Sequence, residues 1–253
     1  EPALSRVNPS EFVKLSQVED EHWWFIGMKS IMARILERLE RPRMTQRILD
    51  AGCGTGGALA WLDKLDEAYG IDRHSLAVAL AQRRDQPRIA RATVEGLPFA
   101  EATFDLVTSF DVLYHVDVSE DVAALREFAR VLVPGGLLLL RLPALEWLGG
   151  SPHDRAVHTK HRYTCSEIAH KLQAARMRSV RVTYVNTTLF LPAMLWRLFQ
   201  RAVGASKSSD VRLPAPLINR VCTALLRIEA IALDFVNFPI GLSVLAIARK
   251  DAE

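Results

Sequence analysis

The chain has 253 residues, of which 49% are hydrophobic and 24% are charged, and its net charge is +3. This length suits one α/β domain with an insertion, and the composition excludes a disordered or collagen-like chain. Three widely spaced cysteines (Cys53, Cys165 and Cys222) cannot form a disulfide framework or a CxxC zinc site, which indicates a reducing cytoplasm. We expect no signal peptide, because the first residues, EPALSRVNPSE, have neither a basic nor an apolar region. We expect no membrane span, because the longest apolar run, 189–196, is far shorter than the ~20 residues that a span needs.

The positive charge is concentrated in one part of the chain. Between Arg176 and Arg227 nine basic residues stand against one acid, Asp210, so this stretch carries +8 and the remainder carries −5. Such an asymmetry indicates an anionic partner for the C-terminal part. No four basic residues are consecutive, so a nucleic-acid-binding arm is not predicted.

Hydrophobic periodicity predicts strands that alternate with helices. Helices are expected over 10–40, from the glycine-rich turn to Leu65, and over 75–84, 119–132 and 166–175. Strands are expected over 47–50, 67–71, 88–94, 104–110, 137–142, 180–186 and 242–249. This alternation predicts an α/β fold with a doubly wound, mostly parallel sheet.

The pattern also suggests a division of the chain into three parts. Residues 1–45 form an N-terminal helical cap, and residues 46–187 with 241–253 form a Rossmann-like domain. Residues 188–240 lie between the last two strands and carry two amphipathic segments, so they are predicted to be a helical insertion that forms a separate subdomain.

The turn after the first strand, LDAGCGTGG (49–57), carries the first chemical signal. Its glycines match G-x-G-x-x-G, which alone is weak evidence for a dinucleotide site. Asp50, just before them, would repel a pyrophosphate but attract a ligand that carries an ammonium and a sulfonium group. Asp72 ends the second strand, where a carboxylate can accept hydrogen bonds from ribose hydroxyls. The two carboxylates therefore favour S-adenosylmethionine over NAD.

The sequence resembles the class I S-adenosylmethionine-dependent methyltransferases, in particular the type-11 group that acts on small molecules. The resemblance covers about 45–142 and rests on LDAGCGTGG (49–57), Asp72, EGLPFAEATFDLV (95–107), DVLYHV (111–116) and RVLVPGG (130–136). It implies a seven-stranded sheet whose last strand is antiparallel. It also implies S-adenosyl-L-methionine as the cofactor and S-adenosyl-L-homocysteine as the product.

The resemblance further assigns residues to the cofactor. It implies that Gly52, Gly54 and Gly56 lie under the methionine part, Asp50 near the ammonium group and Asp72 on the ribose. The cofactor-binding residues expected in full are Asp50, Gly52, Cys53, Gly54, Gly56, Asp72, Arg73, Thr93, Val94, Glu95, Phe110 and Trp24.

Two segments are expected near the adenine and the methyl group of the cofactor. The family normally has an acid at the position of Thr93, before Val94 and Glu95, so Thr93 or the Val94 backbone is expected to meet the adenine. Phe110 and Asp111, at the end of the fourth strand, are expected to face the methyl group.

An aromatic cluster, 22–25 (HWWF), precedes the first strand. In this family such a segment often folds over the cofactor, and Trp24 could gain cation–π attraction from the sulfonium. The alternative is that the cluster packs the N-terminal helix on the sheet.

Methyl transfer to a hydroxyl needs a general base, and histidine is the usual choice near neutral pH. The candidate catalytic residues are His153, His158, His161, His115 and Asp111. For His115 a packing or capping role is the alternative. The loop histidines could instead bind a metal, but their spacing matches no known motif, and no metal is predicted.

The predicted function is S-adenosylmethionine-dependent methyl transfer to a small, apolar or amphipathic acceptor, with O-methylation favoured. An NAD-type oxidoreductase and a non-catalytic cofactor-binding module are the alternatives. The insertion 188–240 is open to three interpretations: a lid over the acceptor, a membrane-surface element, or a packed subdomain. Expected partners are a small-molecule or lipid-like acceptor and the inner membrane face through 188–227, but no nucleic acid. The chain is expected to be a monomer or a homodimer.

Overall fold

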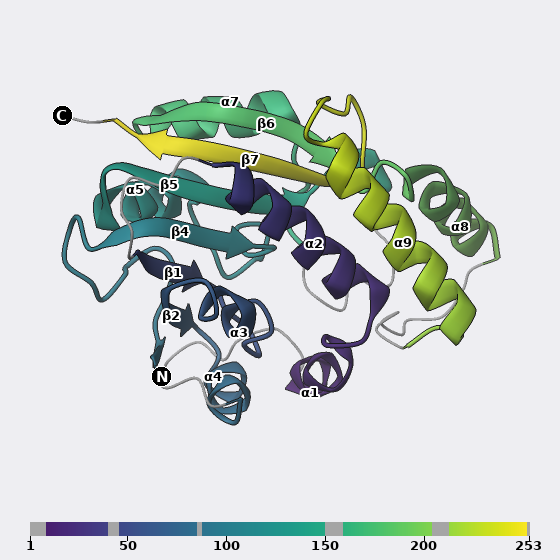
Figure 1. Cartoon of the computed structure of the whole chain (residues 1–253), viewed down its shortest axis with the longest axis horizontal. Helices are drawn as coiled ribbons and strands as arrows, with labels where there is room; N and C mark the ends of the chain where they lie inside the picture. The colour runs from purple at the N-terminus through teal and green to yellow at the C-terminus, as the bar shows by residue number, and fades with distance from the viewer. Residues whose placement is uncertain (1–8, 40–45, 85–87, 150–158, 204–212, 252–253) are drawn as a thin grey trace.

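The computed structural model describes residues 9–39, 46–84, 88–149, 159–203 and 213–251. Its centre is a seven-stranded sheet of order β3-β2-β1-β4-β5-β7-β6 (Figure 1). The strands are β1 (Arg47–Ala51), β2 (Glu67–Asp72), β3 (Ile89–Arg91), β4 (Phe104–Phe110), β5 (Leu132–Pro143), β6 (Met177–Val185) and β7 (Ser243–Lys250). Strands β1 to β5 pair in parallel, whereas β7 runs antiparallel to both β5 and β6. The predicted sheet, with its antiparallel last strand, is confirmed.

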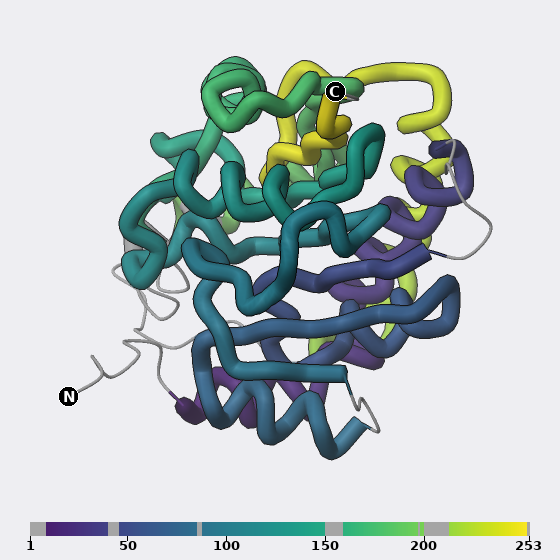
Figure 2. The backbone as a smooth tube through the Cα atoms, turned by 90° about the vertical axis from the view of Figure 1, so that its left-hand side faces the viewer, coloured from purple at the N-terminus to yellow at the C-terminus, as the bar shows by residue number. Residues whose placement is uncertain are grey.

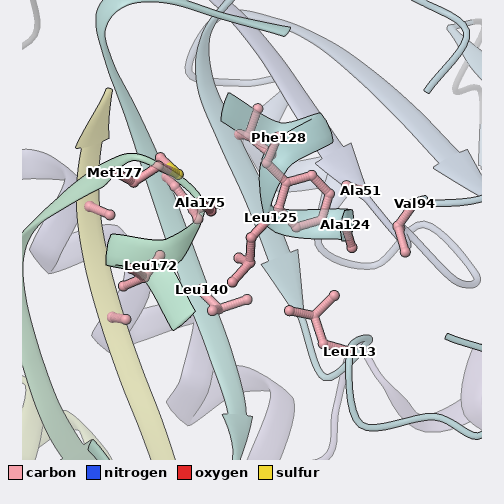
Figure 3. Packing of buried hydrophobic residues seen from close by; sticks show 14 of the residues in the cluster. Ala51, Val94, Leu113, Ala124, Leu125, Phe128, Leu140, Leu172, Ala175 and Met177 are labelled. Carbon is pink, nitrogen blue, oxygen red and sulfur yellow. The ribbon is translucent and has the colours of Figure 1, made fainter. Parts of the chain in front are cut away.

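Helices cover both faces of the sheet, which is the layering that buries parallel strands on both sides (Figure 1). One face carries α5 (Asp121–Val131) and α7 (Cys165–Ala174), and the other carries α2 (Trp23–Arg38), α3 (Leu59–Leu62) and α9 (Pro216–Ala232). Also described are α1 (Pro9–Val18), α4 (Ser75–Gln82), the short 3₁₀ helix η1 (Glu146–Leu148) and α8 (Phe190–Val203). Figure 3 shows Leu125 and Phe128 of α5 and Leu172 of α7 grouped around Leu140 of β5.

Several predicted elements have other bounds in the structure; β5, for example, begins at Leu132 and not at 137. The single helix expected over 10–40 is wrong: α1 and α2 are separated by a turn, and the His22 side chain caps α2 by accepting from the Trp24 N–H at 3.2 Å. The third strand is shorter than 88–94 because a turn at Thr93 follows it, closed by the Gly96 N–H donating to the Thr93 carbonyl at 3.3 Å.

The N-terminal cap and the insertion meet on one face of the sheet. Helices α2 and α9 lie side by side (Figure 1), so close that a Cβ on Gly27 would stand 2.2 Å from Leu226 Cδ1. Leu226 and Ala230 share one hydrophobic core with Ile31 of α2 and Ile48 of β1. Helix α1 lies beside α4 at the opposite end of this face (Figures 1 and 2). Within the described ranges, no helix is both long and apolar enough to cross a membrane.

Candidate active site

The carboxyl ends of the parallel strands open into a cavity of about 1280 Å³. In α/β sheets this edge is where ligands bind, and one small-molecule site usually measures ~300–1,000 Å³. The cavity therefore has room for a cofactor and a second molecule. The expected residues that line it are Asp50, Gly52, Cys53, Gly54, Asp72, Arg73, Thr93, Val94, Phe110, Trp24, Asp111 and His115.

The glycine-rich turn presents bare backbone to this cavity. Gly52 has φ +90°, and a Cβ there would stand 2.3 Å from Val112 Cγ2. Gly54 has φ +54°, and a Cβ there would meet nothing within 4 Å, so the space beside it is open. Glycine tolerates such positive φ values, which L-residues rarely adopt. Gly56 also has a positive φ, but it lies against Ala81 and does not line the cavity.

Asp50 is a buried carboxylate with one oxygen left without a hydrogen-bond partner. The side chain is 1% exposed, and its Oδ1 accepts from Thr108 Oγ1 at 2.9 Å. No donor reaches Oδ2 in the described part of the chain. The pKa of Asp50 is raised to about 7, mainly by burial and also by the nearby Asp72 carboxylate, while the Thr108 hydrogen bond and the Arg141 guanidinium lower it. A ligand ammonium group would supply the missing donor and charge.

Asp72 ties the glycine-rich turn to the end of β2. Its Oδ2 accepts from the Gly54 N–H at 3.0 Å and its Oδ1 from the His74 N–H at 2.7 Å. Burial raises the pKa of Asp72, while these two backbone hydrogen bonds lower it. Each oxygen of a carboxylate can accept a second bond, so Asp72 can still receive hydroxyl donors from a ribose.

Arg141 of β5 is the main cavity residue that the sequence prediction missed. It is 7% exposed, and its guanidinium forms an ion pair with Asp111, with Nε donating to Oδ2 at 3.1 Å. The guanidinium lies 5.4 Å from the ring centroid of Phe110 and 6.0 Å from that of Trp24. Asp111 has φ +57°, a conformation that a non-glycine residue adopts at a cost and often at functional sites. One signal was available: Arg141 is the lone charge in the apolar run 137–142.

The residues expected to meet the adenine lie in two different environments. Thr93 and Val94 line the cavity, whereas Glu95 does not. The Glu95 carboxylate instead accepts from the backbone N–H groups of Ser119 at 3.1 Å and Glu120 at 2.9 Å, just before α5. Glu95 therefore holds the two residues that precede α5 and does not face the cavity.

The candidate catalytic histidines also divide. His115 lines the cavity, and its ring stacks on that of Tyr114 with centroids 4.2 Å apart. His161 does not line it: Nε2 lies 2.9 Å from a Glu167 carboxylate oxygen and Nδ1 lies 3.4 Å from Glu146. His153 and His158 lie outside the described residues. No group of three metal-ligating side chains is found in the part of the chain that the structure describes.

A second buried carboxylate, Glu19, fixes the end of α1 against the glycine-rich turn. Its Oε1 accepts from Thr55 Oγ1 and from Arg84 Nη2, both at 2.7 Å. Its Oε2 would be only 2.4 Å from a Cβ on Gly57. This contact places Phe12 of α1 in the cavity wall. Sequence reasoning did not single out Glu19, because no local pattern indicates a contact over 36 residues.

Residues 49–140 match the family model described as a methyltransferase domain. A malonyl-[acyl-carrier protein] O-methyltransferase from Enterobacter lignolyticus is 37% identical over 106 residues, which is 41% of each chain. An O-methyltransferase from Aspergillus nomiae is 31% identical over 124 residues, 46% of this chain and 54% of the relative. The chain thus spans about half the length of these relatives.

Solved structures agree on the fold. A possible histamine N-methyltransferase from Thermotoga maritima has a TM-score of 0.60 at 17% identity, with 96% of both chains covered. A phosphoethanolamine N-methyltransferase from Haemonchus contortus, solved with S-adenosyl-L-methionine, has a TM-score of 0.57 at 17% identity and covers 87% of this chain and 52% of that one. Residues 49–140 therefore carry a methyltransferase domain, and the sheet has the fold of the S-adenosylmethionine-dependent methyltransferases among these structures. The unsatisfied Asp50 oxygen fits a cationic ligand such as S-adenosyl-L-methionine, which the Haemonchus contortus structure holds.

Proposed function

We propose that the protein transfers a methyl group from S-adenosyl-L-methionine to an oxygen atom of a small, apolar or amphipathic acceptor. The observation that carries this proposal is that one cavity extends from Asp72, at the cofactor end, to Trp196 of α8. Beyond the carboxylates its wall becomes aromatic and apolar, with Trp23 and Phe25 of the N-terminal cap and Leu189 before α8. Such a wall suits the apolar part of an acceptor.

The residues of this chain bind, orient and exclude water, because the bound cofactor itself supplies the activated methyl group on a sulfonium. Asp50 and Asp72 would hold its ammonium and ribose groups. Arg141, fixed by Asp111, would hold a polar group of the acceptor beside Phe110. Oxygen is favoured because two relatives bear the name of O-methyltransferases.

The direct test is an assay for released S-adenosyl-L-homocysteine with pooled amphipathic metabolites and lipid extracts as acceptors. Turnover that depends on an added acceptor would support the proposal. Tight binding of the cofactor without turnover on any acceptor would favour a non-catalytic module. Binding of NAD in place of S-adenosyl-L-methionine in calorimetry would favour an oxidoreductase.

Two histidine variants test whether a histidine acts as the general base. If the acceptor is a hydroxyl, His115→Gln should lower the rate by about 10²–10⁴ while cofactor affinity stays unchanged. His161→Gln is the control, since His161 is paired with Glu167 away from the cavity, and it should retain activity. Equal, wild-type rates in both variants would mean that neither His115 nor His161 acts as the base.

A further inference from the structure

The exposed apolar residues of this protein are concentrated on one small region. Of eighteen large hydrophobic side chains that are exposed in the described part of the chain, thirteen lie between Leu191 and Val236. This region comprises α8, α9 and the segment after α9, and Figure 1 shows both helices at the same end of the molecule. A concentration of this kind marks a surface that contacts something else.

Helix α9 has a second apolar side, which faces outward, besides the side with Leu226 and Ala230 that packs in the core. At helical spacing, Leu217, Val221, Ala224, Ile228 and Ile231 form one stripe, and all five are exposed, Leu217 by 73%. We name this set the outer stripe of α9. A surface helix usually has one apolar stripe, which faces the core, and polar residues on its outer side.

Polar contacts fix this orientation from the inner side. Asn219 accepts from the Trp23 N–H at 2.8 Å and donates to the Glu21 carbonyl at 2.8 Å. Glu229, 1% exposed, accepts from the backbone N–H groups of Thr187 at 3.2 Å and Thr188 at 2.9 Å. Rotating α9 to bury its outer stripe would break these hydrogen bonds. The contacts on the inner side therefore hold the apolar stripe on the outside.

The charge beside the outer stripe is positive. Arg220 and Arg227 are exposed and lie seven residues apart, on one flank of the stripe. The sequence from 190 to 232 holds six basic residues and two acids, and one of those acids, Glu229, is buried. An apolar stripe with an arginine flank is complementary to an anionic lipid surface, which takes the stripe among its acyl chains and pairs the arginines with phosphates.

The cavity reaches the same region. Trp196 of α8 lines the cavity and is 57% exposed, and its ring stacks on that of Phe199 with centroids 5.8 Å apart. Arg227 of α9 lines the cavity as well. We propose that the outer face of α8 and α9 docks on an anionic membrane surface and presents the cavity to it. The part of this inference that concerns the acceptor's route rests on the proposed function, whereas the docking itself does not.

The test is flotation of the full chain with vesicles, without cofactor or acceptor, so that its outcome is independent of methyl transfer. We expect binding to vesicles of phosphatidylglycerol and phosphatidylcholine, and far weaker binding to phosphatidylcholine alone. Val221→Ser with Ile228→Ser should weaken binding by at least about tenfold. Arg220→Gln with Arg227→Gln should weaken it by roughly 30-fold, selectively on anionic vesicles.

Leu65→Ser is the matched control, because Leu65 is an exposed apolar residue away from α8 and α9, and it should bind as the wild type does. Thermal unfolding of each variant checks that the fold is retained. The proposal would be overturned if the wild-type protein did not bind anionic vesicles, or if the stripe variants bound them as strongly as the wild type does. A wild-type dimer that the stripe variants convert to monomer, without vesicle binding, would assign this face to a second copy of the chain and overturn it equally.

Discussion

Two buried carboxylates, Asp50 of β1 and Glu229 of α9, show how this chain separates function from structure. Asp50 and Glu229 are both 1% exposed. Thr187 and Thr188 satisfy both oxygens of Glu229, whereas Oδ2 of Asp50 receives no hydrogen bond from the residues that the structure describes. A buried polar atom normally has a hydrogen-bond partner. The unpartnered Oδ2 of Asp50 therefore indicates that a ligand binds there, whereas the fully hydrogen-bonded carboxylate of Glu229 indicates a structural role.

The largest expected effect tests the structural carboxylate. Glu229→Ala should lower the free energy of unfolding by about 3–5 kcal/mol, because it leaves the N–H groups of Thr187 and Thr188 and the Thr188 hydroxyl without an acceptor. Chemical denaturation followed by circular dichroism measures this change. Glu37→Ala, at an exposed position of α2, is the control and should stay within about 0.5 kcal/mol of wild type. Equal losses in the two variants would refute the assignment.

The second prediction concerns the cofactor end. Asp72→Ala should weaken S-adenosyl-L-methionine by about 1–3 kcal/mol, roughly 5- to 150-fold, because ligand hydroxyls lose their acceptor. The Gly54 N–H loses its partner as well, so the turn itself is loosened. Calorimetry gives the affinity, and thermal unfolding confirms that the variant is folded. The assignment of Asp72 fails if affinity is unchanged in a folded variant.

Most residues that the sequence assigned to the cofactor line one cavity, and the signals that pointed to them are local. The glycines and Asp50 are adjacent in the chain, and a carboxylate at the end of β2 must lie at the same sheet edge. The Arg141–Asp111 pair joins two strands, and only the three-dimensional register, in which Phe110 pairs with Arg141, brings its partners together.

The orientation of α9 was beyond sequence reasoning for a related reason. The outer stripe has the periodicity of a core-facing stripe, and an isolated sequence gives no way to know that Asn219 and Glu229 anchor the opposite side. The predicted insertion therefore correctly contains two helices, while the packing of α9 on α2 follows from contacts between segments that are almost 200 residues apart.

The smallest expected effect is a pH dependence that arises from Asp50. The pKa of Asp50 is raised to about 7 by burial, so below pH 7 most of the protein carries a neutral carboxyl that does not attract an ammonium group. A bound cation favours the charged form, and binding therefore releases a proton in this range. Affinity for S-adenosyl-L-methionine should rise with pH, by at most about tenfold per unit below pH 7, and level off above it.

The same shift has the opposite sign for the stability of the protein without cofactor. The folded pKa lies above the ordinary value of 3.8, so this contribution to stability is fully present below that value and is lost as pH rises through about 7. Asp50→Asn removes the titration, and both slopes should flatten. Calorimetric dissociation constants at pH 5.5, 6.5 and 7.5 for wild type and variant measure the first slope, and denaturation at the same pH values measures the second. Parallel slopes in the two proteins would show that another group titrates, and Asp50 would then lose its role as the ammonium site.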